Sequence, residues 1–172
     1  MRPGLVLAVV LAAAPCLARA AQAYTVSVEH LARSSDAVVR GQVEGSRSFR
    51  SEDRLRVYTE YLVRARTVLR GRAPALARVV VPGGIEGNLG QRVDGAPTLA
   101  RGEELVVFLK REERDTFSVT ALAQGKFSVV GGAVARPDLS RFTFVQSSIP
   151  PGERRSEEMP VAELERRVRS TR

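Results

Sequence analysis

The chain of 172 residues contains one cysteine, Cys16, and one histidine, His30. A lone thiol cannot form a disulfide bond within the chain, so packing must stabilise the fold. A single imidazole cannot complete a zinc site without carboxylate partners. His30 lies in a predicted helix next to Leu31, where a structural role is the usual one. We therefore expect no bound metal and no cofactor.

Recognisable catalytic motifs are also missing. A hydrolase needs a nucleophile within reach of a base, and the sequence has no Gly-x-Ser-x-Gly elbow. The glycine-rich segment 83–90 is not followed by Lys-Ser or Lys-Thr, which a phosphate-binding loop requires. Acids that could do acid–base chemistry are Glu86 and Asp94, the pair Glu103-Glu104 and the pair Glu112-Glu113, but all of them are equally typical of solvated loops, turns and strand edges. We expect that the protein is not an enzyme.

Lysine is scarce, because only Lys110 and Lys126 are present, and arginine carries nearly all of the positive charge in a formal net charge of +8. An arginine-rich surface can bind phosphate, sulfate or acidic polysaccharide. It can equally be an ordinary solvated surface encoded by a genome that favours arginine codons. The charges are spread along the chain rather than clustered, which favours the second interpretation.

Long apolar stretches are limited to residues 5–14, which are too few to cross a bilayer of about 30 Å. A basic start precedes this stretch, and Ala21-Gln22-Ala23 follows it, which is the layout of a secretory signal peptide. We predict a signal peptide over residues 1–23, cleaved near Ala23 or, alternatively, after Ala20. The mature protein would be secreted or periplasmic, would begin at Tyr24 and would have no transmembrane segment.

The remainder of the chain has the two-residue periodicity of half-buried strands. Strands are predicted over residues 37–44, 56–69, 78–81, 104–110, 116–122, 127–130, 133–135 and 141–145. A short helix is predicted over 27–35, capped by Ser27, and another that begins with Pro160 as its first helical residue. This pattern predicts an all-β fold, a five-stranded OB-like Greek-key barrel with a short N-terminal helix and a short C-terminal helix.

The predicted domains are the signal peptide, the barrel over residues 24–146, and a polar linker with the terminal helix over 147–172.

Three segments resemble the strands of the netrin-like module, which includes the inhibitory domain of tissue inhibitors of metalloproteinases. Residues 35–43 have the sequence Ser-Asp-Ala-Val-Val-Arg-Gly-Gln-Val, residues 61–71 end in Val-Leu-Arg-Gly, and residues 102–109 begin Gly-Glu-Glu-Leu. The resemblance implies an OB-type barrel, secretion and a protein-binding role. It does not imply zinc chelation, because the family's amino-terminal cysteine is replaced by Tyr24 at the predicted start, and the family's disulfides are absent.

Two candidate binding regions follow from these patterns. The first combines the N-terminal edge with a glycine-rich segment, 82–102, which has no clear strand or helix period. Its candidate residues are Tyr24, Gly83, Gly84, Glu86, Asn88 and Arg92. The second is the outward side of the long predicted strand and the residues just before it. Its candidate residues are Arg54, Arg56, Tyr58, Arg64 and Arg66.

The sequence therefore predicts a non-enzymatic binding module with a protein partner, of which an extracellular protease is one candidate. The alternative is binding of an anionic glycan or envelope polymer by the arginine face. Secretion argues against nucleic acid as the ligand.

Overall fold

The computed structural model describes residues 21–23, 26–113, 115–137, 139, 142–144 and 158–171. Its helical elements are α1 (Val28–Ser34), η1 (Leu122–Gly125, a 3-10 helix) and α2 (Val161–Ser170). The strands are β1 (Ala21–Ala23), β2 (Ala37–Arg50), β3 (Val57–Gly71), β4 (Leu76–Pro82), β5 (Gly84–Glu86), β6 (Leu89–Gln91), β7 (Glu104–Arg111), β8 (Thr116–Val119), β9 (Lys126–Val130), β10 (Val134–Pro137), β11 (Phe142–Phe144) and β12 (Met159–Pro160).

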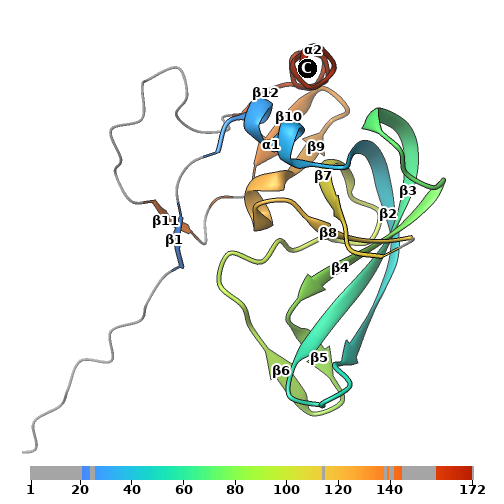
Figure 1. Ribbon diagram of the computed structural model, residues 1–172, viewed down its shortest axis with the longest axis vertical. Helices are drawn as coiled ribbons and strands as arrows, with labels where there is room; N and C mark the ends of the chain where they lie inside the picture. The colour runs from blue at the N-terminus through green and yellow to red at the C-terminus, as the bar shows by residue number, and fades with distance from the viewer. Residues whose placement is uncertain are drawn as a thin grey trace, which may run out of the picture.

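Five strands close into a barrel (Figure 1). The order is β7-β2-β3-β4-β8, and β8 pairs back onto β7, which completes the circle. The β4–β8 pair is parallel, and the other four pairs are antiparallel. Closure of the sheet leaves few exposed edges. The predicted five-stranded OB-like barrel, with a short helix near each end of the chain, is confirmed.

Two hydrophobic clusters lie on opposite sides of the sheet. The barrel interior is filled by Ala37, Val39, Val43, Val63, Ala77, Val79, Val81, Ala96, Leu99, Leu105, Val107, Leu109, Phe117 and Val119. The outer cluster contains Val28, Leu31, Ala32, Val38, Leu69, Val106, Phe108, Phe127, Ala135, Val161, Leu164 and Val168. Strands β2 and β7 contribute to both clusters, so they are apolar on both faces.

Helix α2 packs on the outside of the barrel through Val161, Leu164 and Val168, which are buried together as their spacing predicts. The helix begins one residue later than predicted, because Pro160 is its N-cap residue and Val161 its first residue. Arg167 joins α2 to α1 through two hydrogen bonds to Glu29, 2.7 and 2.8 Å long. The terminal helix is therefore a docked part of the fold.

Three register shifts interrupt the β2–β3 pairing, between Val38 and Val39, between Arg40 and Gly41, and between Val43 and Gly45. An extra residue in one strand of a pair redirects the side chains that follow it. The uniform alternation predicted for residues 56–69 is therefore wrong at its C-terminal end. Ala65 packs on the barrel interior, whereas Leu69 belongs to the outer cluster.

Residues 82–102 contain two strands, β5 and β6, that the sequence analysis did not predict. They form a hairpin in which Glu86 pairs with Leu89, and the two-residue turn is Gly87-Asn88. Gly87 has a φ of 62°, a left-handed conformation that glycine adopts without strain. Strand β1, inside the predicted signal peptide, pairs with β11 in a separate two-stranded sheet.

Candidate functional site

One end of the barrel is open because β2 and β3 continue beyond β7. Strand β7 pairs with β2 only along Ala37–Gln42. The pairing ends at Glu104, the first residue of β7, because the turn at residues 100–103 just before it runs away from β2. The segment 83–98 crosses this opening, and its β5–β6 hairpin lies at the far end of the long strands (Figure 1). We call this end of the protein the barrel mouth.

Polar contacts from β3 hold the crossing segment in place. The amide of Gly83 donates to the carbonyl of Val57 over 2.8 Å, and the Thr59 hydroxyl donates to the carbonyl of Gly83 over 2.8 Å. The amide of Val57 donates to the side chain of Gln91 over 2.5 Å. Gly84 has a φ of 139°, and a side chain there would collide with the Thr59 hydroxyl. Glycine is therefore required at the point where the segment enters the mouth.

An open cleft of about 210 Å³ lies between the crossing segment and the inner face of β3 and β4. It is lined by Thr59, Tyr61, Val81, Pro82, Gly83, Gly84, Gln91, Arg92, Val93, Ala96, Pro97 and Thr98. Burial raises the pKa of Tyr61, although a hydrogen bond from the backbone of Leu99 acts in the opposite direction. Tyr61 is therefore a neutral phenol at physiological pH.

Exposed apolar side chains gather at the barrel mouth. Leu55, in the turn between β2 and β3, is 78% exposed, and Ile85, in β5, is 74% exposed. Leu89, on the partner strand β6, is 37% exposed and lies on the opposite face of the hairpin from Ile85, because Ile85 pairs with Gly90. Figure 1 shows the β2–β3 turn and the β5–β6 hairpin at the same end of the molecule. We call these three side chains the apolar tip.

The structure brings part of the first predicted region together. Gly83, Gly84 and Arg92 line the cleft, while Glu86 and Asn88 lie beside it in the hairpin. Tyr24 is outside the described residues.

The N-terminal segment at Val26 lies near the other end of the crossing segment. The amide of Val26 donates to the Gln124 side chain over 3.0 Å, and the amide of Ala123 donates to Gly95 over 3.0 Å. The N-terminal segment and the crossing segment therefore both contact η1.

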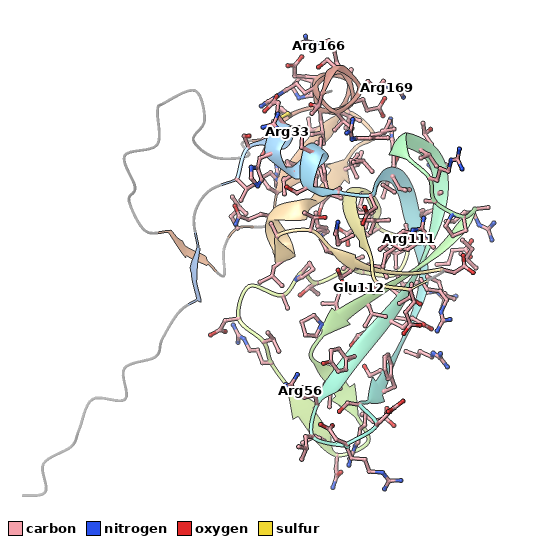
Figure 2. The ribbon with its side chains drawn as sticks, in the orientation of Figure 1. Arg33, Arg56, Arg111, Glu112, Arg166 and Arg169 are labelled. Carbon is pink, nitrogen blue, oxygen red and sulfur yellow. The ribbon has the colours of Figure 1, made fainter. Side chains whose placement is uncertain are left out.

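The four predicted arginines do not form one surface. Arg54 lies in the β2–β3 turn with a φ of 60°, whereas Arg66 lies ten residues along β3 from Arg56, about 33 Å at strand spacing. Figure 2 shows Arg56 at the mouth end of the molecule.

Three of these arginines also have acidic or polar side-chain partners. Arg64 forms a two-bonded salt bridge with Glu44, and Arg66 donates to Gln42 over 3.0 Å. Arg56 and Tyr58 share a hydrogen bond that raises the pKa of the arginine.

A buried carboxylate that was not predicted from the sequence lies on the outer face of the mouth. Glu60 is 5% exposed and accepts hydrogen bonds from Arg47 over 2.9 Å and from Arg78 over 2.7 Å. Burial acts to raise the pKa of Glu60, but the two arginines outweigh it and hold that pKa below its usual value. The pairing register of β2 and β3 would have predicted the contact with Arg47, because Arg47 lies directly opposite Glu60 on the neighbouring strand.

Among the described residues, no three metal-binding side chains are grouped together, and no helix has the length and hydrophobicity to span a membrane. Comparison with models of known protein families, with curated proteins and with solved structures found no match to this chain. The fold and the site define the class of protein, a small mixed β-barrel domain with an open mouth.

Proposed function

We propose that the protein is a secreted or periplasmic, non-enzymatic binding module, and that its barrel mouth binds a protein partner. The exposure of the apolar tip carries this proposal. Leu55 and Ile85 are more than two thirds exposed on two neighbouring loops, which costs about 1.5–3 kcal/mol for each side chain relative to burial. A partner surface that covers both would recover part of this free energy.

The size of the cleft favours a protein over a small molecule. Pockets that bury drug-sized ligands have volumes of about 300–1,000 Å³, whereas the cleft has about 210 Å³. A cleft of this size accommodates one or two side chains of a partner. The apolar tip beside it resembles the centre of a protein interface, and the arginines Arg54, Arg56 and Arg92 around it resemble a rim.

The resemblance to the netrin-like module supports the same proposal. That module also presents loops at one end of an OB-type barrel, and some of its members bind secreted proteases. A secreted protease is therefore a candidate partner for this chain. The anionic-polymer alternative receives less support, because Arg64 and Arg66 are already engaged with neighbouring side chains.

Site-specific photo-crosslinking in the producing cells tests the proposal. A photoreactive amino acid replaces Ile85 at the apolar tip, and the matched control replaces Val130, which is 45% exposed on β9. We expect position 85, but not position 130, to form a discrete covalent adduct with another protein. Equal labelling at both positions, or none at position 85, would contradict the proposal.

A further inference from the structure

The part of β2 that extends beyond β7 has an open edge. The amide of Gly102 donates to the carbonyl of Val43 over 2.8 Å, and the amide of Val43 donates to Glu103 over 3.0 Å. These are the last backbone bonds on this side of β2 within the described residues. Figure 1 shows the lower half of β2 along the border of the sheet, with β3 on its other side only.

The hairpin geometry shows which backbone groups point outward. The amide of Ser51 donates to the carbonyl of Arg56 over 2.9 Å, so Arg50 and Val57 are the non-hydrogen-bonded pair that precedes the turn. In a regular antiparallel ladder, hydrogen-bonded and non-hydrogen-bonded residue pairs alternate strictly. The N–H and C=O groups of Ser46, Ser48 and Arg50 therefore face the open edge, whereas those of the intervening residues face β3.

We propose that this edge, from Ser46 to Arg50, takes up an extended acidic peptide segment of a partner protein as an added β-strand. Three outward donors and three outward acceptors at alternate residues match the hydrogen-bonding groups of such a strand. The inference rests on the proposed function, because it names the element of the partner that the barrel mouth binds.

The side chains along the edge determine the expected charge of the peptide. Arg47 pairs with Glu60, yet its side chain is 70% exposed, and Arg50 is exposed and forms no side-chain hydrogen bond or ion pair with another described residue. Phe49 lies between them and stacks on Tyr58 with ring centroids 5.9 Å apart. Arg47 and Arg50 lie three residues apart and project from opposite faces of the sheet. Carboxylates on either face of an added strand would therefore meet one of these arginines.

A second copy of this chain is a less suitable occupant. The chain has a formal net charge of +8, so two copies repel each other. Glu44, the extra residue at the start of the open edge, interrupts the pleat there, and such irregularities discourage pairing between identical edges. An acidic segment carries charge opposite to that of the chain and has no such irregularity of its own.

Amide hydrogen exchange measured by NMR tests the inference. The probe is an acetylated and amidated hexapeptide of alternating Glu and Val, and the control peptide alternates Lys and Val. At saturation the Glu peptide should slow exchange at Ser46, Ser48 and Arg50 at least tenfold. Exchange at Arg47 and Phe49, which already bond to β3, should not change, and the Lys peptide should not bind.

A pair of variants tests the role of charge. Arg50→Glu should weaken binding of the Glu peptide at least fivefold, whereas Arg33→Glu, on α1 at the opposite end of the molecule (Figure 2), should not change it. Both side chains are exposed, so both variants should fold normally.

The inference is overturned if the Glu peptide does not bind, or if it binds without slowing amide exchange at alternate residues of the edge. It is also overturned if the edge is protected without peptide in a concentration-dependent dimer, which would identify a second copy as the occupant. In each case crosslinking at position 85 would still decide the proposed function separately.

Discussion

Replacing Leu164 by alanine should destabilise the protein by about 3 kcal/mol. The side chain is fully buried in the outer cluster, where α2 packs against α1 and the sheet. Leucine-to-alanine changes in protein cores cost about 2–5 kcal/mol, because transfer free energy is lost and a cavity remains. For a domain of this size the loss corresponds to a fall in Tm of roughly 6–12 °C.

Urea denaturation followed by circular dichroism measures this change as a shift of the midpoint at constant slope. The matched control is Arg166→Ala on the same helix, whose side chain is 71% exposed and pairs with Glu163. The control should change the free energy of unfolding by less than about 0.5 kcal/mol. If Leu164→Ala were as mild as the control, α2 would not be docked on the barrel.

Four further predictions concern the fold and its charges. The pKa of Glu60 is lowered in the folded state, so its contribution of about 1–3 kcal/mol is present at neutral pH and is lost progressively as the pH falls below the ordinary value of 4.5 and through the folded-state pKa. In denaturant titrations, Glu60→Gln should therefore destabilise the protein most at neutral pH and progressively less as the pH falls below 4.5. Gly125→Ala should cost more than about 2 kcal/mol, because the new Cβ would collide with a backbone carbonyl, and an unchanged melting curve would show that this loop relaxes. Removal of residues 1–23 should leave Tm within about 2 °C, because β1 pairs only with β11 outside the barrel sheet; a larger fall would mean that the predicted signal peptide is part of the mature fold. Replacing both Arg64 and Arg66 by alanine should leave the salt concentration for elution from an anionic matrix unchanged, whereas earlier elution would favour the anionic-polymer alternative.

The barrel could be predicted from the sequence because most of its strands have an apolar face and a polar face. Periodicity located β3, β4 and β7 to within a few residues. Strand β2 extends to Arg50, beyond the predicted end at residue 44, because the polar residues 45–48 bury no regular face and give no hydrophobic signal. Their pairing with β3 comes from the hairpin rather than from hydrophobicity.

The β5–β6 hairpin could have been predicted from its turn residues. Gly87-Asn88 is a two-residue turn of a type that joins short strands. The outer cluster was also foreseeable in part, because residues 105–109 of β7 are apolar at every position and so must be buried on both faces.

The candidate site was only partly predictable. Two full strands, β3 and β4, separate Leu55 from Ile85 in the sequence, and only the three-dimensional path of these strands places the two loops at one end. The burial of Glu60 depends on two arginines from neighbouring strands, which no local pattern reveals. The open edge of β2 depends on the turn at residues 100–103, which a one-dimensional pattern does not relate to β2.

The central claim, that the barrel mouth is a protein-binding surface, is tested most directly by affinity. The partner recovered by crosslinking at position 85 is titrated against the wild type and against the double variant Leu55→Ser and Ile85→Ser. We predict a loss of affinity of at least about tenfold, as expected for removal of an apolar anchor, with an unchanged Tm. An unchanged Kd would contradict the account.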